Sequence, residues 1–476
     1  MIDANEAWTA AETRAALALF ERAGHRIYWI EDPIPRDDFG LTPSLDEPAA
    51  VVAAATDDAA GRTPFATGLR KWVLLVSLGV VFFTLLTLYA SCLGVLLPNQ
   101  IQNIDPAGKA KTLGIIYAIT SVFSTLTTPI AGALSDRTRS RFGRRTLWIV
   151  IGATIGRVAI ILTPYGGGLV GITAIWLVSV VTLNSMQPAI TTLVADRFPP
   201  EERGLASGVV GGAMTAGVSF GTFFAGTLAS RIPLAYGIVG TAIIVVCLAF
   251  VVINPEPRVA LPPATPLKLG TFLTGFWISP REHPHFAWAF LGRFAIYMGY
   301  QAILTYLLYI LQDHIAMSQA SANRMIASMS IITFVALVVS GLGSGVLSDR
   351  LGRRKPLVFL ASLVMAAAVA MPLIVPTAQG MFAYAVLIGL GYGAFMSVDL
   401  ALMTQVLPKH KPGAEDATGK DLGILTTAVN VPQILSPVMA AALLSSTGNN
   451  YTVLFVVSGV FVLVGSFLVL PIRSVR

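Results

Sequence analysis

The chain has 476 residues, of which 55% are hydrophobic and only 12% are charged. Its mean hydropathy of +0.73 excludes an ordinary soluble domain and is typical of a protein with many membrane-spanning helices. The net charge of +7 does not indicate a nucleic-acid partner, because the excess Lys and Arg residues fall in short segments between apolar spans. Cys92 and Cys247 lie inside apolar spans without metal-ligand spacing, and we expect no metal and no cofactor.

Residues 1–70 form an acidic N-terminal extension with 6 basic and 12 acidic side chains. The segment has no apolar run long enough for a signal peptide. Residues 1–40, with Asp3 and Glu31 at the ends of two expected strands and a helix expected over 10–24, resemble a piece of the mandelate racemase branch of the enolase superfamily. The resemblance implies that these two acids match metal ligands. One such unit cannot close an eight-stranded barrel, and the catalytic base is missing. We therefore predict no catalytic role, and a flexible linker over about 34–70.

Twelve apolar spans follow, and each has about the length that a helix needs to cross the hydrocarbon layer. They are expected at residues 72–97, 112–134, 146–164, 169–195, 204–228, 233–253, 286–312, 325–347, 356–376, 379–407, 422–446 and 452–471. The sequence thus predicts an all-α membrane protein. Six spans fall within 71–254 and six within 286–476, and residues 255–285 form a proline-rich connecting loop.

A strongly basic segment at 135–145 separates the second and third spans. It contains Arg137, Arg139, Arg141, Arg144 and Arg145. A central Arg costs about 2.5–3.5 kcal/mol on membrane-insertion scales, so this loop is expected to stay in the cytoplasm. Most other Lys and Arg residues between spans fall on the same side under this assignment. We therefore expect a plasma-membrane protein with both termini in the cytoplasm.

The start of this loop recurs in the second half of the chain. Residues 132–137 read Gly-Ala-Leu-Ser-Asp-Arg, and residues 345–350 read Gly-Val-Leu-Ser-Asp-Arg. Two copies at corresponding places predict two homologous six-helix bundles, which is the internal symmetry of many secondary transporters.

Both copies resemble the signature loops of the major facilitator superfamily, which follow its second and eighth helices. The matching positions are Gly132, Asp136, Arg137, Gly143, Arg144 and Arg145 in the first copy, and Gly345, Asp349, Arg350, Gly352, Arg353 and Arg354 in the second. The first copy, with Arg141 inside it, is most similar to the glycoside–pentoside–hexuronide and sucrose symporter branch. The resemblance implies that Asp136, with Asp349 in the second copy, and the arginines form a cytoplasmic charge latch that helps to hold the outward-facing state. A pure topology signal is the alternative. Asp196, after the fourth span, would face the arginines of the first loop, and simple solvation of Asp196 is the alternative.

The resemblance also places helices 1, 4, 7 and 10 around a central cavity. Arg293 in the seventh span and Asp399 in the tenth lie at similar depth, roughly 10–13 Å from the same ends at 1.5 Å per residue. We expect them to form an ion pair, either one that opens with solute or proton binding or a permanent structural bridge.

Other polar side chains share the faces of these four spans by helical spacing. The candidate solute contacts are Tyr297, Tyr300, Gln301, Tyr392, Asn184 and Gln187. Tyrosine rings mixed with amide groups suit a polyhydroxylated solute, although each residue could instead serve helix packing.

Taken together, the sequence predicts a monomeric, proton-coupled symporter of a small, sugar-like solute, and not an enzyme. It would alternate between two orientations of its bundles in the lipid bilayer. An exporter of drugs or hydrophobic metabolites with the same fold is the alternative, and a non-transporting sensor is a further one.

Overall fold

The computed structural model describes residues 2–3, 30–31, 65–138, 140, 143–199, 202–256, 284–351, 354–406 and 418–471. The chain divides into two compact units, Met1–Ala66 and Thr67–Arg476. In the first unit, β1 (Ile2–Asp3) pairs in parallel with β2 (Ile30–Glu31), with Asp3 opposite Glu31. These strands lie in the two segments where strands were expected. The expected helix over 10–24 and most of the expected linker lie outside the described residues.

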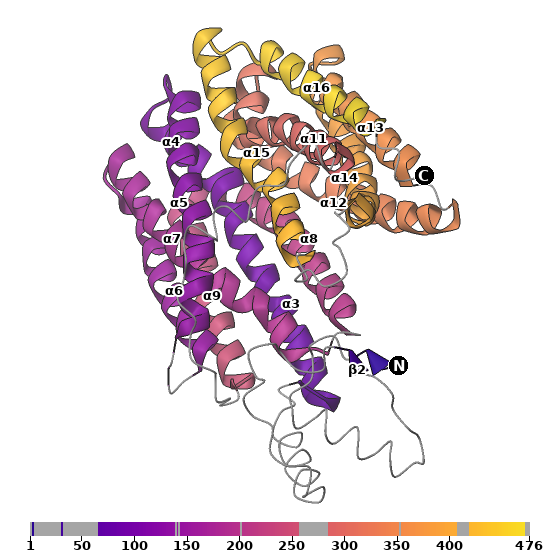
Figure 1. The fold of residues 1–476 in the computed structure, drawn as a ribbon. Helices are drawn as coiled ribbons and strands as arrows, with labels where there is room; N and C mark the ends of the chain where they lie inside the picture. The colour runs from indigo at the N-terminus through magenta and orange to yellow at the C-terminus, as the bar shows by residue number, and fades with distance from the viewer. Residues whose placement is uncertain are drawn as a thin grey trace, which may run out of the picture. The chain divides into compact units, whose positions relative to one another are not determined.

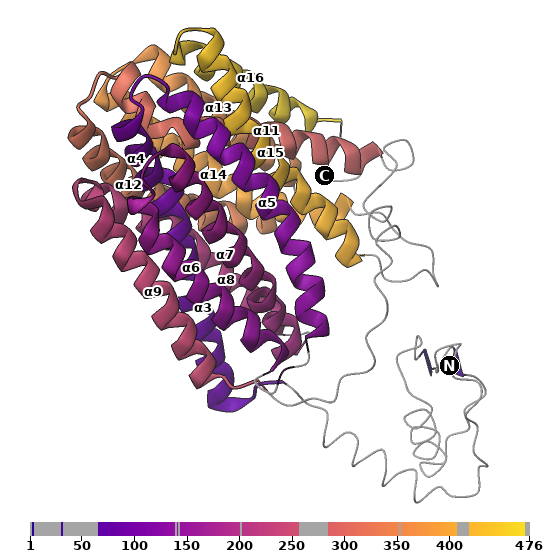
Figure 2. The same ribbon diagram turned by 90° about the vertical axis from the view of Figure 1, so that its left-hand side faces the viewer.

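The described part of the second unit is helical. Its N-terminal half contains α3 (Gly68–Ser91), the π-helical turn η2 (Cys92–Leu96), α4 (Leu97–Ile104), α5 (Lys109–Arg137), α6 (Arg144–Leu162), α7 (Leu169–Arg197), α8 (Arg203–Leu228) and α9 (Ile232–Ile253). Its C-terminal half contains α11 (Pro284–Tyr309), the π-helical turn η6 (Ile310–His314), α12 (Gln319–Leu351), α13 (Arg354–Ile374), α14 (Ala378–Val406), α15 (Thr418–Ser446) and α16 (Tyr451–Leu468). Figure 1 shows the two halves as two neighbouring groups of helices, one indigo to magenta and the other salmon to yellow, and Figure 2 shows the same helices from the side.

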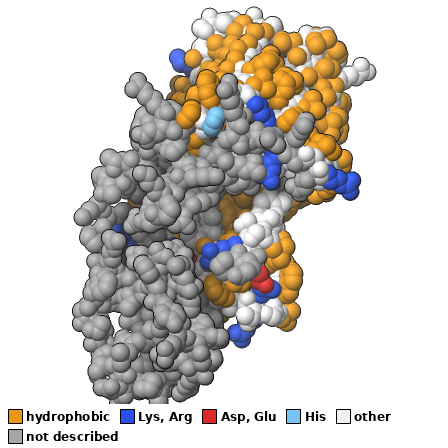
Figure 3. All heavy atoms as spheres, turned by 45° about the vertical axis from the view of Figure 1, so that its right-hand side comes forward, with side chains coloured by type: hydrophobic (Ala, Val, Ile, Leu, Met, Phe, Trp, Pro, Cys, Tyr) orange, Lys and Arg blue, Asp and Glu red, His pale blue; other side chains and the backbone are white. Residues whose placement is uncertain are grey.

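Eleven segments of the described chain are long and apolar enough to cross a membrane. One of them, Arg203–Ile253, contains both α8 and α9, separated by the short turn η5 (Ala229–Arg231). Each of the twelve expected spans therefore corresponds to a helical pass, which confirms the predicted all-α membrane fold. The described surface in Figure 3 is mostly apolar, as lipid contact requires.

Hydroxyl groups inside the spans mostly donate to a carbonyl of their own helix. Thr120 bonds to the carbonyl of Ile116 at 2.8 Å, and Ser466 bonds to that of Val462 at 2.8 Å. These local bonds satisfy polar side chains where no water is present. A Ser or Thr in a span is therefore no sign of a ligand site by itself.

Glycines bring helices of the same bundle into close contact. A Cβ atom on Gly217 or Gly221 of α8 would collide with the α3 backbone at Phe83 or Thr87. The missing side chains allow two hydrogen bonds between these helices, from Thr87 Oγ1 to the Gly217 carbonyl (3.2 Å) and from Ser91 Oγ to the Gly221 carbonyl (2.9 Å). Close approach of this kind replaces the hydrophobic effect as the packing force in lipid.

The two bundles contact each other at one end, which we call the closed end. There Asn99 of α4 hydrogen-bonds to Asn323 of α12, and the hydroxyl of Tyr309 on α11 donates to the carbonyl of Pro98 at 3.0 Å. The opposite end carries the two arginine-containing loops of the internal repeat, between α5 and α6 and between α12 and α13, and we call it the basic end.

Helix α8 shows the difference between the two ends. A Cβ on Gly226, at the closed end, would lie 2.6 Å from the Asn323 carbonyl oxygen of the other bundle. A Cβ on Gly208, Gly211 or Gly212, towards the basic end, would meet no described heavy atom within 4 Å. Helix α8 thus contacts the other bundle near its C-terminal end, whereas open space lies beside these three glycines in its N-terminal half.

Candidate functional site

An ion pair lies within the spans of the C-terminal bundle. The Nε atom of Arg293 on α11 is 3.2 Å from Oδ2 of Asp399 on α14, and the two side chains are only 10% and 2% exposed. Neither of these two atoms has a hydrogen-bond partner in the described part of the chain. The contact is therefore a charge attraction without hydrogen-bond alignment. The structure brings together the two residues that the sequence placed at equal depth.

Aromatic side chains from the same two helices surround this pair. The hydroxyl of Tyr297 lies 3.3 Å from that of Tyr392 and donates to Sδ of Met396 at 2.9 Å. The ring of Tyr300 stacks on that of Tyr392, with centroids 4.8 Å apart and planes inclined by 15°. The Arg293 guanidinium lies 5.9 Å from the centre of the Tyr297 ring. We call these tyrosines, with Met396 and the ion pair, the α11–α14 cluster.

The remaining candidate contacts are less closely tied to this cluster. Asn184 of α7 is buried, and its amide donates to the carbonyl of Val180 in its own helix at 2.8 Å. Gln187 of α7 and Gln301 of α11 are half-buried. Among the described residues, no hydrogen bond or ion pair joins either α7 amide to the α11–α14 cluster. The candidate contacts that touch one another therefore lie in the C-terminal bundle.

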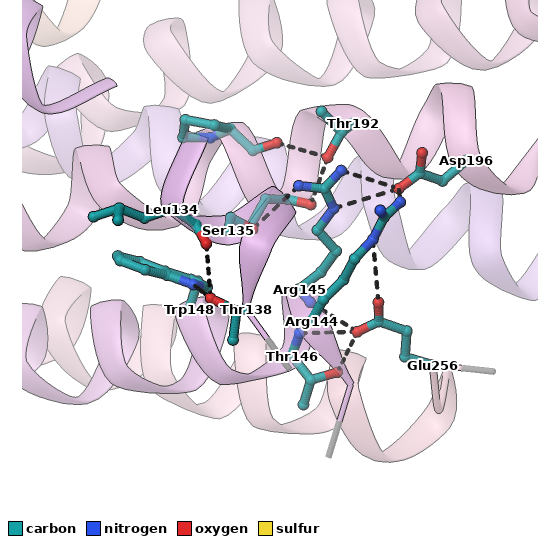
Figure 4. Close-up of polar contacts among 12 residues, drawn as sticks. Leu134, Ser135, Thr138, Arg144, Arg145, Thr146, Trp148, Thr192, Asp196 and Glu256 are labelled. Atoms are coloured by element: carbon teal, nitrogen blue, oxygen red, sulfur yellow. Dashed lines mark hydrogen bonds and ion pairs between the residues drawn. The ribbon is translucent and has the colours of Figure 1, made fainter. Parts of the chain in front are cut away.

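A second charged group lies at the basic end of the N-terminal bundle (Figure 4). Oδ2 of Asp196, near the end of α7, accepts a hydrogen bond from Arg144 Nη2 at 2.8 Å and contacts Arg145 Nη2 at 3.3 Å. Arg145 is 4% exposed and also donates to Ser135 Oγ at 3.1 Å. The acid after the fourth span thus lies between the two arginines that begin α6.

Glu256, within the connecting loop expected over 255–285 and absent from the predicted site residues, is part of the same group. Its Oε2 accepts from the backbone N–H of Arg145 at 2.8 Å and of Thr146 at 3.2 Å, and its Oε1 is 4.0 Å from Arg144 Nε. It therefore caps α6, where a negative charge is favoured by the helix dipole. Gly143 has φ of +104°, and a Cβ there would collide with the Glu256 carboxylate. The available sequence signal was a lone acid directly after the sixth span, on the side of the basic loop.

The other motif residues are described only in part. Arg137 ends α5, Arg350 lies in the last turn of α12 and Arg354 begins α13. Gly132 faces Pro188 of α7, and Gly345 faces Ser397 of α14. Outside the described residues or side chains lie Asp136, Arg141, Asp349, Gly352 and Arg353. The latch role of Asp136 and Asp349 stays a prediction.

Comparison with known families gives one match that spans most of the chain. The family described as Major Facilitator Superfamily matches residues 78–415. The protein named MFS transporter asaE, from Aspergillus flavus, is 25% identical over 458 residues, which cover 93% of this chain and 94% of that protein. The Fujikurins efflux protein of Gibberella fujikuroi is 27% identical over 199 residues, which cover 41% of this chain and 40% of that protein.

Solved structures show the same fold at low sequence identity. A bacterial homologue of the human lysosomal transporter Spinster, in an inward-facing and unoccupied conformation, superposes with a TM-score of 0.65 at 15% identity, covering 86% of this chain and 98% of that one. A D-xylose-proton symporter gives a TM-score of 0.58 at 16% identity, covering 85% and 98%. The comparisons do not support the narrower sugar-symporter branch or the enolase resemblance of residues 1–40, which stay predictions.

Proposed function

Because the chain belongs to the major facilitator superfamily, we propose that it is a secondary transporter that moves a small organic solute through a site beside the α11–α14 cluster and couples this movement to protons. The family consists of membrane transporters, so the chain is a multi-pass transport protein and not an enzyme.

The observation that carries the proposal is the Arg293–Asp399 pair. Both residues lie within membrane-spanning helices, where an ionised side chain costs several kcal/mol unless it has a partner or water. Nε of Arg293 and Oδ2 of Asp399 are close but form no hydrogen bond with each other, so a bound solute, or a proton on Asp399, would compete mainly with a charge attraction. Protonation of Asp399 would release Arg293 for a solute, which links proton binding to solute binding.

We assign the basic end to the cytoplasm of a plasma membrane, with both termini on that side. The excess of Lys and Arg in the loops at that end supports this orientation. In this orientation the closed end faces outward, and the described conformation has its bundles apart on the cytoplasmic side. The Asp196–Arg144–Arg145 group would then belong to the charge latch at the cytoplasmic end.

A sugar-like solute is the first candidate. The clustered tyrosines can stack on a sugar ring, and Gln187 and Gln301 can donate and accept hydrogen bonds.

Export of a hydrophobic metabolite is the second candidate, and two observations favour it. The hydroxyl of Tyr297 is already bonded to Tyr392 and Met396, so this part of the cluster offers aromatic surface more than free polar groups. One relative is named an efflux protein.

Transport by purified protein in liposomes tests the proposal and separates the candidates. Under an imposed pH gradient, labelled sugars should accumulate on the alkaline side if the first candidate is correct, and an aromatic dye or metabolite should move against the proton flow if the second is correct. The variant Asp399→Asn should lose gradient-driven transport while inserting normally. Transport of neither solute class, or full gradient-driven transport by Asp399→Asn, contradicts the proposal.

A further inference from the structure

Two asparagines from opposite bundles form a reciprocal pair at the closed end. Nδ2 of Asn99 on α4 donates to Oδ1 of Asn323 on α12, and Nδ2 of Asn323 donates to Oδ1 of Asn99, both at 2.8 Å. The two residues are 0% and 5% exposed. They are 224 positions apart in the chain and belong to different halves of the transporter.

The amide of Asn99 uses its full hydrogen-bonding capacity in this arrangement. Its Nδ2 also donates to the carbonyl of Val95 at 2.8 Å, and its Oδ1 also accepts from Nε2 of Gln319 at 2.8 Å. A primary amide has two donor and two acceptor positions, and all four are occupied here. Val95 lies in η2, so the π-helical turn of the first pass holds the Asn99 side chain in place for its partner.

The backbone next to the pair is also in close contact. Gly226 of α8 lies against the Asn323 carbonyl oxygen, and a Cβ on Gly226 would come within 3.0 Å of the Ala327 side chain. The two amides are therefore shielded from water by both bundles. A hydrogen bond in such a place is expensive to leave unmade, because each separated amide must find another partner.

Charged contacts also join the bundles at this end, but they are more exposed. Nζ of Lys109 on α5 is 2.7 Å from Oδ1 of Asp313 in η6, and the Asp313 side chain is 33% exposed. Salt weakens an exposed pair of this kind, whereas it leaves a buried amide pair unchanged. The closed end thus has both a charged contact that responds to salt and a buried amide pair that does not.

We propose that Asn99 and Asn323 are positioning residues that form an uncharged latch between the bundles. The latch must separate before the closed end opens, so its strength sets how much of the time the solute site is open towards the basic end. Because neither side chain titrates, a pH gradient acts on the ion pairs of the transporter and leaves this latch unchanged. The latch would act in the same way for any solute and for either direction of transport.

A buried reporter cysteine at the closed end measures the opening directly. Ala327 is 4% exposed and lies at the contact between α8 and α12. The variant Ala327→Cys, on a background with Cys92 and Cys247 replaced by Ala, would be treated with a membrane-impermeant maleimide added at the closed end. The labelling rate then reports how often this end opens, and it requires no solute.

Asn99→Leu and Asn323→Leu each leave one amide without its partner. We expect each to raise the labelling rate about tenfold, which corresponds to about 1.4 kcal/mol, within the usual cost of an orphaned buried amide. The double variant leaves neither asparagine amide orphaned, and Gln319 keeps its second acceptor, Asn103 Oδ1, so the rate of the double variant should not exceed that of the faster single variant. Thr120→Val is the matched control, because it removes a buried hydroxyl that bonds only within its own helix, and its labelling rate should equal that of the parent.

Gln319→Ala provides a milder test if a leucine variant fails to insert. Gln319 is half-buried and donates one hydrogen bond to Asn99 Oδ1, so its removal should raise the labelling rate about threefold.

A salt test separates the amide latch from the charged contact. In the Lys109→Gln variant of the reporter protein, which lacks the Lys109–Asp313 pair, the labelling rate should be the same at low and at high salt. The proposal is overturned if Gln319→Ala and the single leucine variants label at the parental rate, or if the effects of Asn99→Leu and Asn323→Leu multiply in the double variant. These outcomes do not depend on the solute assays, so the latch and the proposed transport function can fail separately.

Discussion

Arg293 of α11 and Asp399 of α14 form an ion pair with almost no exposure, with Nε and Oδ2 3.2 Å apart. Both residues come from the C-terminal bundle, and the tyrosines beside them come from the same two helices. The N-terminal bundle presents neutral amides and hydroxyls, many of them bonded to their own helix. The ion pair and the clustered tyrosines therefore both lie in one half of a twofold architecture.

Removing one partner of this pair should affect stability as well as transport. Asp399→Asn leaves the Arg293 charge buried without compensation, which typically costs about 3–5 kcal/mol. The double variant Arg293→Gln/Asp399→Asn removes both charges and should recover most of that stability. Thermal unfolding in detergent and proton-driven uptake would be measured on the same preparations.

The two readouts separate a coupling role from a purely structural bridge. If the pair couples protons to solute, the double variant is stable but does not accumulate solute against its gradient. If the double variant is stable and also accumulates solute normally, the pair is only a structural bridge.

Glu256 should contribute to the stability of the N-terminal bundle. It is 13% exposed and accepts hydrogen bonds from two backbone N–H groups at the start of α6. Glu256→Gln keeps the size but removes the charge, and we expect a loss of about 1.5–3 kcal/mol, as for other hydrogen bonds to charged groups. Glu202→Gln is the matched control, because its pair with Lys71 is 35% exposed at the carboxylate and exposed pairs are worth about 0–1 kcal/mol. Equal unfolding temperatures for the two variants would show that the cap is not important.

The helices were predictable because membrane insertion depends on local properties of the sequence. Length, apolar character and the position of arginines determine a span without knowledge of its neighbours. The Arg293–Asp399 contact was also predictable from the sequence, because counting residues from the ends of the seventh and tenth spans shows that the two side chains lie at similar depth. Helical spacing likewise placed Tyr297, Tyr300 and Tyr392 near this pair.

The contacts between distant segments were not predictable in this way. Asn99 and Asn323 each look like an ordinary polar residue near a helix end, and only the folded structure shows that they meet. Glu256 gave only a weak signal, since an acid in a solvent-facing loop is usually solvated. Asn184 shows the opposite case, because its bond to Val180 leaves it less free for a solute than its position in the fourth span suggested.

Asp196→Asn should separate the latch role of the basic end from its role in orientation. The arginines alone are sufficient for the topology signal, so the loop should stay in the cytoplasm after this change. Asp196 contacts both Arg144 and Arg145, and its neutralisation should lower the transport rate severalfold by changing the balance between conformations. A Ser140→Cys reporter, labelled from either side of the membrane, measures the orientation of the same variant.

Normal orientation with slower transport in Asp196→Asn supports the charge latch at the basic end. Unchanged transport would mean that Asp196 and the two arginines serve only as a topology signal. Labelling of Ser140→Cys from the outside alone would contradict the proposed orientation of the whole protein.

Two glycines of α8 should respond in opposite ways to the same substitution. A Cβ on Gly217 would lie 3.1 Å from the Phe83 Cα atom of α3 and closer still to its carbonyl oxygen, so two backbones would have to separate. The hydrogen bond from Thr87 to the Gly217 carbonyl would lengthen as well. Gly217→Ala should therefore destabilise the protein by about 1–3 kcal/mol, as overpacking usually does.

Gly212→Ala is the matched case five residues earlier on the same helix. No described heavy atom lies within 4 Å of the added methyl group, and alanine is favoured over glycine inside a helix by about 0.5–1 kcal/mol. Its unfolding temperature in detergent should equal or exceed that of the parent, while that of Gly217→Ala falls. A similar loss in both variants would mean that α8 is packed along its whole length, and the bundles would then not be apart at the basic end.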